Sequence, residues 1–250
     1  MNGIDVSHHQ GIINWESVAK SGIEFTIIKA GGSDKGFYKD SKFEDNYAGA
    51  KKAGLAVGAY YYVGKNCTTR YAGISDAQRF IELLKGKQFD FPVFIDLEST
   101  PTSAKSGATE AVIGFCETLE AAGYYVGIYA SDISGFKDRL NIDKLSKWAK
   151  WVARYGSQPK YVEQYGIWQK SETGRVGGIS GNVDLDECYV DYPTVIRAAG
   201  KNGFSKPVES TASTESTASI VATVEPTGKN TLSFAVSIDG KTYSGTIELV

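Results

Sequence analysis

Eight short runs of β-branched and aromatic residues, separated by amphipathic segments, constrain the fold of this chain more than any other sequence feature. The strand-like runs cover 3–7, 24–30, 56–63, 92–98, 124–130, 150–155, 166–169 and 182–186. Helix-like segments cover 14–20, 42–53, 75–85 and 109–122, and Gly54, Gly86 and Gly123 follow three of them as left-handed caps. This alternation predicts an α/β fold, a (β/α) barrel that is irregular in its second half, where the connections are shorter.

The composition changes near Lys206, which predicts a second part of the chain. Residues 1–205 carry the barrel pattern, and 206–219 read as a Ser/Thr-rich linker too poor in apolar residues to pack. Residues 220–250 predict a small all-β domain of three strands, because apolar residues alternate on both sides of the turn dipeptide Asp239-Gly240. Such a unit is marginally stable alone, so we expect it to dock on the barrel or, preferably, to self-associate into a homo-oligomer.

Two carboxyl groups mark the most informative strand. Asp96 and Glu98 follow an apolar run and are separated by one residue, so both side chains project to the same face. At the C-terminal end of a barrel strand they would face the usual active-site side. Hydrolysis of a glycosidic bond needs two such acids, one of which donates a proton to the leaving oxygen. The alternative is that both are solvated side chains at a strand end.

Two further carboxyl groups belong to the first and last strand-like runs. Asp5 and Asp184 lie on segments that are neighbours when a barrel closes, so we expect them to converge beside Asp96 and Glu98. Four carboxylates in one bowl repel each other, and the arrangement is costly unless one of them keeps its proton.

Several function classes are disfavoured by the composition. The 27 basic and 29 acidic residues give a net charge of −2, which offers no attraction to nucleic acid or to an anionic membrane. No apolar run is long enough for a membrane span. Cys67, Cys116 and Cys188 are widely separated, and His8 and His9 are adjacent, so we expect neither a disulfide framework nor a metal. The N-terminus shows no secretory signal, which suggests synthesis in a reducing cytoplasm.

Eight motifs occur in an order that resembles one known family over residues 1 to about 190. They are GIDVSHHQGIINW (3–15), FTIIKA (25–30), VGAYYY (57–62), VFIDLE (93–98), GIYAS (127–131), WVARY (151–155), IWQ (167–169) and GNVDL (181–185). The chain resembles glycoside hydrolase family 25, the Chalaropsis-type lysozymes that act as N-acetylmuramidases. The resemblance implies cleavage of the β-1,4 bond between N-acetylmuramic acid and N-acetylglucosamine in bacterial peptidoglycan. It also implies an irregular (β/α)5(β)3 barrel without a metal or other cofactor.

The resemblance also assigns residues by motif position. Glu98 matches the catalytic acid, Asp96 the second acid of the pair, and Asp5 and Asp184 the supporting aspartates. The positions that line the cleft of the family are occupied here by Tyr60, Tyr62, Tyr129, Lys29, Trp168 and Gln169. The chain departs from the family at Tyr61, where the family often has histidine, at Gly31-Gly32, where it often has an acidic residue soon after the Lys-Ala pair, and at Lys170, where it often has tyrosine. These departures affect substrate contacts and leave the carboxylate set intact.

The hypothesis is a two-part lysozyme. The barrel would cleave the glycan, while residues 220–250 would bind a wall polysaccharide and hold the enzyme there. A chain without a signal that attacks an external polymer fits a phage endolysin, which stays in the host cytoplasm until release and then acts on the cell wall. Asp96 would either orient the N-acetyl group as an internal nucleophile, retaining configuration, or position water, inverting it. The rivals are a non-hydrolytic carbohydrate-binding protein, a chitinase-like hydrolase, and a tail that only stabilises the barrel.

Overall fold

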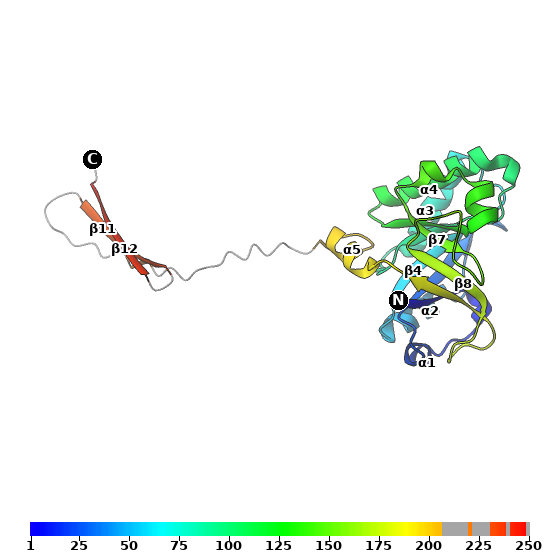
Figure 1. The fold of residues 1–250 in the computed structure, drawn as a ribbon, viewed down its shortest axis with the longest axis horizontal. Helices are drawn as coiled ribbons and strands as arrows, with labels where there is room; N and C mark the ends of the chain where they lie inside the picture. The colour runs from blue at the N-terminus through cyan, green and yellow to red at the C-terminus, as the bar shows by residue number, and fades with distance from the viewer. Residues whose placement is uncertain (207–219, 222–230, 239–240, 249–250) are drawn as a thin grey trace. The chain divides into compact units, whose positions relative to one another are not determined.

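The structure is a computed structural model that describes residues 1–206, 220–221, 231–238 and 241–248. The chain divides into two compact units, Met1–Lys206 and Pro207–Val250, which can be followed by colour in Figure 1. Within the described ranges, no helix combines the length and the apolar character that crossing a membrane requires.

A closed ring of eight strands forms the first unit. In spatial order the strands are β1 (Asn2–Val6), β9 (Val183–Cys188), β8 (Ile167–Gly174), β7 (Ala149–Ala153), β6 (Val126–Ser131), β5 (Val93–Asp96), β4 (Ala56–Tyr62) and β2 (Phe25–Gly32). Pairing of β1 with β2 closes the ring. Strand β9 is antiparallel to both of its neighbours, whereas the other neighbouring pairs of the ring are parallel. The two-residue strand β3 (Tyr38–Lys39) pairs with the end of β2.

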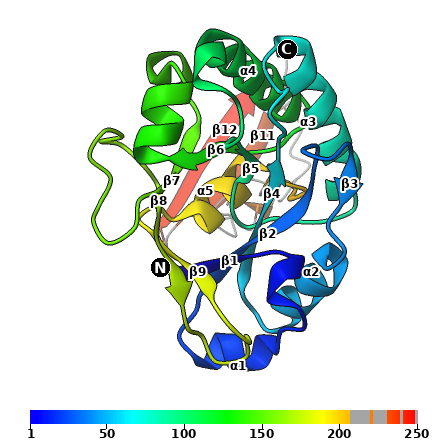
Figure 2. The ribbon, with the colours of Figure 1, turned by 90° about the vertical axis from the view of Figure 1, so that its right-hand side faces the viewer.

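Helices connect the strands in the first half of the barrel and lie outside the ring, as Figure 2 shows for α2, α3 and α4. They are α1 (Trp15–Lys20), α2 (Phe43–Lys52), α3 (Arg70–Leu84) and α4 (Lys105–Ala121). Shorter turns are η1 (His8–Gln10), η2 (Thr102–Ala104), η3 (Asp132–Lys137) and η4 (Ile142–Leu145). Strands β7, β8 and β9 follow one another without a helix between them. The closed barrel and its irregular second half are therefore confirmed.

The alternation of side chains along each strand produces two separate apolar layers. Phe25, Ile27 and Trp151 point into the barrel, where they join a buried aromatic cluster. Ile28 and Ile95, on the opposite faces of their strands, belong to a larger cluster between the strands and the helices. The barrel interior is thus a packed core at one end, and the other end is available for polar side chains.

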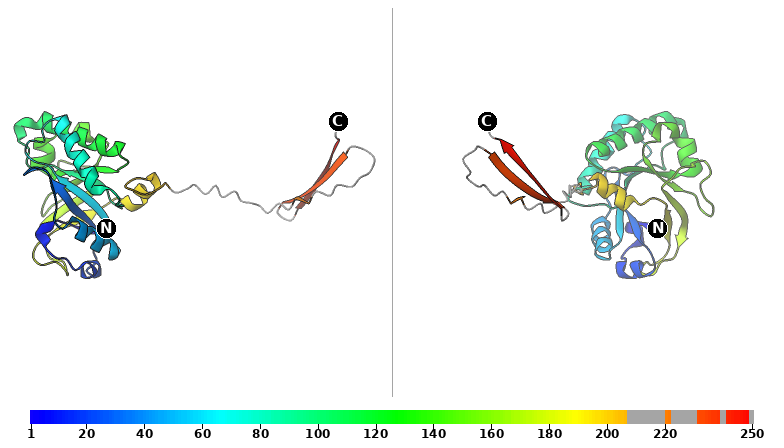
Figure 3. Two further views of the ribbon diagram at one scale, coloured as in Figure 1. Left: turned by 180° about the vertical axis from the view of Figure 1, so that it is seen from behind. Right: turned by 60° about the vertical axis from the view of Figure 1, so that its left-hand side comes forward.

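The amino-terminal end of the barrel is closed by aromatic rings and by a final helix. Phe25 and Phe91 stack with 4.3 Å between ring centroids, and a Cβ atom at Gly3 would lie only 2.2 Å from the Phe25 ring. Helix α5 (Tyr192–Ala199) contributes Tyr192 and Ile196 to the same cluster. Figure 3 shows this helix, in yellow, at one end of the ring. The functional groups must therefore lie at the opposite end.

Each of the eight expected strands overlaps an observed one, and the glycines expected as helix caps adopt positive φ values of +81° at Gly54, +73° at Gly86 and +89° at Gly123. The elements that were not expected include β3, α5, the short turns η1 to η4 and the first turns of α3 and α4. Helix α3 begins at Arg70, five residues before the expected start, because the Thr69 side chain accepts a hydrogen bond from the Ala72 amide and caps it.

The described part of the second unit is a three-stranded antiparallel sheet. It contains β10 (Ile220–Val221), β11 (Thr231–Ile238) and β12 (Lys241–Glu248) in that order, and Ile238 pairs with Lys241. The described strands overlap the three expected ones, and the small all-β domain at 220–250 stays a prediction. The turn at 239–240 and the linker at 206–219, apart from Lys206, lie outside the described residues. No role of residues 220–250 is tested by this sheet.

Candidate active site

A polar cavity of about 170 Å³ opens at the carboxyl-terminal end of the barrel strands. It is lined by Asp5, Tyr60, Asp96, Glu98, Tyr129, Trp151, Tyr155, Gln169 and Asp184. The strand registers explain this convergence, because Asp5 is paired with Asp184 across β1 and β9, and Asp96 with Tyr129 across β5 and β6. The structure thus brings the four sequence-predicted carboxyl groups together, along with Tyr60, Tyr129 and Gln169.

Asp96 and Glu98 form a contacting pair within this cavity. The Asp96 side chain is 4% exposed, whereas Glu98 is exposed at the mouth. Burial, followed by the negative charge of Glu98 and their hydrogen bond, raises the pKa of Asp96 well above its usual value, and Lys29 opposes this. Within the described residues, Asp96 Oδ1 is buried without a hydrogen-bond partner. The ionised form of the inner carboxyl group, that of Asp96, is therefore disfavoured.

A chain of hydrogen bonds fixes the orientation of Asp5 on the opposite wall. Gln169 Nε2 donates to Asp5 Oδ2 at 2.7 Å. The Gln169 amide oxygen accepts hydrogen bonds from the hydroxyl groups of Tyr129, at 2.8 Å, and Tyr155, at 3.2 Å. Because both hydroxyl groups donate to the oxygen of Gln169, its amide nitrogen must face Asp5. Asp5 is therefore held as an acceptor in a fixed position.

Asp186 is a further member of the carboxyl group cluster that sequence reasoning missed. It is 1% exposed, lies one pleat below Asp184 on β9, and contacts Asp5 through a hydrogen bond. Its Oδ1 accepts from Trp151 Nε1 at 2.8 Å. Burial raises the pKa of Asp186 to about 8, and burial with nearby Glu172 and Glu98 raises that of Asp184 to about 6. The period of two along a strand, applied to Asp184, could have identified Asp186.

Three residues predicted to line the cleft are placed differently from the rest. The Tyr62 hydroxyl group lies 2.6 Å from Ser99 Oγ, and the Lys29 ammonium lies 4.6 Å from the centre of the Tyr62 ring, and neither residue lines the cavity. Trp168 precedes Gln169 and therefore has the opposite strand orientation, and its Nε1 donates to the Arg154 carbonyl oxygen at 2.7 Å. Trp151 and Tyr155 line the cavity instead, and neither was predicted.

The described residues contain no group of three or more His, Cys, Asp or Glu side chains arranged to hold a metal ion. A closed barrel with a pair of carboxyl groups at the carboxyl-terminal end of its strands, one of them protonated, has the architecture of a barrel-type glycoside hydrolase.

Comparisons with known proteins identify the family. The sequence pattern of Glycosyl hydrolases family 25 matches residues 4–179, and the chain belongs to this family. It is 36% identical over 188 residues to the autolytic lysozyme of Clostridium acetobutylicum, covering 75% of this chain and 55% of that protein. It is 32% identical over 206 residues to lysozyme M1 of Streptomyces globisporus, covering 75% of this chain and 67% of that one.

The solved structures include similar folds. The crystal structure of the CTP1L endolysin superimposes with a TM-score of 0.69 at 26% identity, covering 79% of this chain and 69% of that chain. The present chain thus spans little more than half of the Clostridium lysozyme and about two thirds of the other two proteins.

Proposed function

We propose that this chain is a peptidoglycan hydrolase, a lysozyme that cleaves the β-1,4 bond between N-acetylmuramic acid and N-acetylglucosamine. The observation that carries the proposal is the convergence of Asp5, Asp96, Glu98 and Asp184 on one open cavity. The names of its relatives, an autolytic lysozyme and lysozyme M1, support the same substrate. A surface that only bound carbohydrate would gain little from crowded carboxyl groups, since these repel one another.

Glu98 is the general acid in this mechanism. It is the carboxyl group at the exposed mouth, where a glycosidic oxygen can approach within hydrogen-bonding distance. Its contact with Asp96 gives it access to the proton that the pair holds. When the bond breaks, the proton passes to the leaving oxygen, and the anionic cluster stabilises the positive charge that develops on the sugar ring.

The geometry favours a retaining, substrate-assisted route. Asp96 is in hydrogen-bonding contact with Glu98, whereas an inverting pair is separated by about 6.5–9.5 Å to leave room for the attacking water. Asp96 would therefore orient the N-acetyl group, whose oxygen attacks the anomeric carbon. NMR of the product within the first minutes should show the β-anomer, and an initial α-anomer would contradict this route.

Asp186 supports Asp5 from below. Burial raises the pKa of both carboxyl groups, and the hydrogen bond between them raises the pKa of Asp5 and lowers that of Asp186, so Asp5 donates and Asp186 accepts. With Gln169 donating to Asp5 Oδ2, Asp5 is held in one orientation towards the cavity. Asp186 is thus a positioning residue, since it lies beneath the groups that line the cavity.

Residues 220–250 would bind a wall polysaccharide, with homo-oligomer formation as the second role to consider. A weak second site on the same chain increases retention on an insoluble substrate, because its binding becomes intramolecular. Pull-down on purified walls, with and without residues 206–250, tests this, and unchanged retention would contradict it. The same proposal includes an endolysin-like localisation, in which the protein stays in a host cytoplasm until release and then acts at the wall. The similarity to the CTP1L endolysin supports this part.

Mass spectrometry of the fragments released from purified peptidoglycan tests the proposed function directly. A lysozyme leaves N-acetylmuramic acid at the new reducing end. Reducing N-acetylglucosamine ends, or release of peptides alone, would overturn the proposal. Parallel digestion of chitin separates a muramidase from a chitinase-like enzyme, since chitin carries no muramic acid.

A further inference from the structure

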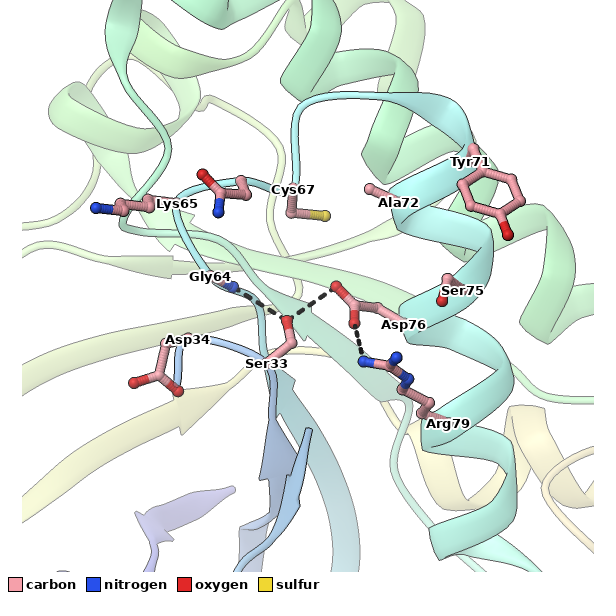
Figure 4. A pocket seen from close by; sticks show the side chains of 11 residues that line it. Ser33, Asp34, Gly64, Lys65, Cys67, Tyr71, Ala72, Ser75, Asp76 and Arg79 are labelled. Atoms are coloured by element: carbon pink, nitrogen blue, oxygen red, sulfur yellow. Dashed lines mark hydrogen bonds and ion pairs between the residues drawn. The ribbon is translucent and has the colours of Figure 1, made fainter. Parts of the chain in front are cut away.

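A second cavity, of about 290 Å³, lies at the same end of the barrel between the ends of β2 and β4 and the first half of α3 (Figure 4). The Ser33 amide donates to the Tyr62 carbonyl oxygen at 2.9 Å and the Gly64 amide donates to Ser33 Oγ at 3.2 Å, so the floor is fixed to both strands. None of the residues assigned above to the catalytic cluster lines this cavity. It is therefore a distinct feature of the substrate-facing end.

The wall of this cavity contains a buried carboxyl group. Asp76 is 6% exposed and accepts a hydrogen bond from Ser33 Oγ at 2.9 Å and from the Tyr61 hydroxyl group at 3.4 Å. Arg79, one turn along α3, approaches Asp76 to 4.0 Å. Figure 4 shows the two groups facing one another. A buried network of this kind holds the base of the cavity in one geometry.

Three side chains with hydrogen-bond donors form a row on α3. Tyr71, Ser75 and Arg79 are spaced at i, i+4 and i+8, so they lie on one face of the helix, and all three line the cavity. The Arg79 guanidinium lies 5.6 Å from the centre of the Phe37 ring. Within the described residues, the Arg79 guanidinium donates no hydrogen bond to another side chain. The Arg79 side chain is 45% exposed. Its planar fork of donors is suited to a carboxylate.

The position of the cavity suggests which carboxylate it meets. Gly32, the residue before Ser33, is paired with Tyr62, and Tyr62 is paired with Asp96 on the next strand. Two strand spacings of about 4.8 Å place the cavity about 10 Å from the Asp96 strand. The muramic acid residue of peptidoglycan carries a peptide, and an extended peptide covers this distance in about three residues. A sugar bound at Glu98 can therefore deliver its peptide to this cavity.

We infer that the cavity beside Arg79 binds a carboxylate of the peptide attached to muramic acid, with Arg79, Ser75 and Tyr71 as its donors. The inference rests on the proposed function, because the glycan that is bound in the cleft carries the peptide to the cavity. It makes the enzyme selective for glycan that still bears its peptides.

The test compares Arg79→Met with the unaltered chain on two substrates. Both substrates are purified peptidoglycan freed of phosphate polymers, and one is also stripped of peptides by an amidase. Loss of one charge-assisted contact should lower kcat/KM about tenfold on the peptide-bearing glycan and leave it unchanged on the stripped glycan. Arg79→Lys keeps the charge but not the planar pair of donors. Its kcat/KM on the peptide-bearing glycan should lie between those of the unaltered chain and Arg79→Met.

Arg175→Met is the matched control, because it removes the same kind of side chain outside this cavity. It should not alter the ratio of the two kcat/KM values. Equal losses for Arg79→Met on both substrates, or no loss on either, would overturn the inference. So would a defect that appears only on walls retaining their phosphate polymers, since Arg79 would then recognise phosphate.

A binding measurement separates failure of this inference from failure of the proposed function. The free tetrapeptide released by the amidase, added to the full chain, should shift the NMR signals of Ser75 and Arg79, and Arg79→Met should abolish the shift. If the unaltered chain cleaves neither glycan, the proposed function is wrong. If it cleaves both equally well and the tetrapeptide produces no shift, only the peptide site is wrong.

Discussion

Two buried aspartates that pair with basic side chains, Asp90 and Asp132, have pKa shifts opposite to those of the buried aspartates in the catalytic cavity. Asp90 and Asp132, at 3% and 1% exposure, are as buried as Asp5, Asp96 and Asp186, at 5%, 4% and 1%. Burial alone would raise the pKa of Asp90, but Lys51, 2.7 Å away, and Arg197 lower it below its usual value. The other three carboxyl groups have raised pKa values.

The donors explain this difference. Burial is again opposed at Asp132, where the backbone amides of Lys160 and Val162, both at 2.9 Å, and the Arg154 guanidinium lower the pKa. In the catalytic cavity, the carboxyl groups have other carboxyl groups among their nearest partners. Within the described residues, no basic side chain forms a salt bridge with a carboxyl group of this cavity. The cationic and amide donors around Asp90 and Asp132 favour their ionised forms, whereas the neighbouring carboxyl groups in the cavity disfavour ionisation of Asp5, Asp96 and Asp186.

The largest effect is expected at Glu98, the exposed carboxyl group at the mouth of the cavity. Glu98→Gln removes the transferable proton, and general acid catalysis contributes roughly 10²–10⁴-fold, so kcat should fall at least about 100-fold. The Tm should not change, because the side chain is exposed. Turbidity clearing of cell walls measures the loss, with Glu163→Gln, another exposed position, as the control. Near-normal clearing would show that the proton comes from elsewhere.

Asp96→Asn should also reduce activity strongly while leaving the fold intact. Burial raises the pKa of this carboxyl group and disfavours its ionised form, so a neutral amide of the same shape fits the buried position. The variant cannot ionise during the reaction, and loss of one such electrostatic group costs about 100-fold in kcat. Equal melting curves with unequal rates are expected. A large fall in Tm would instead mean that Asp96 stabilises the fold, as the paired aspartates do.

Asp90→Asn should give the reverse result. Loss of the charge leaves Lys51 and Arg197 without their partner and should lower the free energy of unfolding by about 2 kcal/mol at pH 7. For a chain of this size the Tm falls by about 4–8 °C. Because the pKa of Asp90 is lowered by folding, its stabilisation is present above about pH 4 and is lost as the pH falls further. Asp143→Asn, on the exposed surface, is the control, and kcat should not change in either variant.

Asp186→Asn should have the smallest effect. The sign of its Tm change at pH 8 distinguishes an aspartate of the catalytic cavity from one that is ionised and paired. The raised pKa of Asp186 means that the unfolded chain loses this proton first, so the stability of the folded chain declines between about pH 4 and pH 8. Asparagine removes that decline and retains a side-chain oxygen that can accept from Asp5. Thermal melting should show a Tm about 2–4 °C higher at pH 8 and no difference at pH 4. A lower Tm at pH 8 would mean that Asp186 is ionised and paired.

The sequence predicted the carboxyl groups well because strand ends are local features. Asp96 follows an apolar run, Asp5 and Asp184 each follow one apolar residue of a strand-like run, and the closure of a barrel brings the first and last runs together. Asp186 was missed because it was treated as the end of its strand, although β9 continues to Cys188. Alternation of side chains was applied to Asp96 and Glu98 and not to this strand.

Other parts of the site depend on packing that no local pattern contains. Trp151 reads as a core residue, and it is one, yet its indole nitrogen also fixes Asp186 across the barrel. The Arg79 cavity depends on an additional turn of α3 that the Thr69 cap creates. Such contacts arise between segments distant in sequence, so they require the fold before they can be recognised.

The antiparallel pairing of β1 with β9 has a consequence for synthesis of the protein. Asp5 emerges from the ribosome among the first residues, but its partners at 184 and 186 are nearly 180 positions later. A nascent or truncated chain that stops before β9 can contain Glu98 and still lack half of the acidic cluster. The catalytic machinery therefore remains incomplete inside the producing cell until almost the entire barrel has been translated.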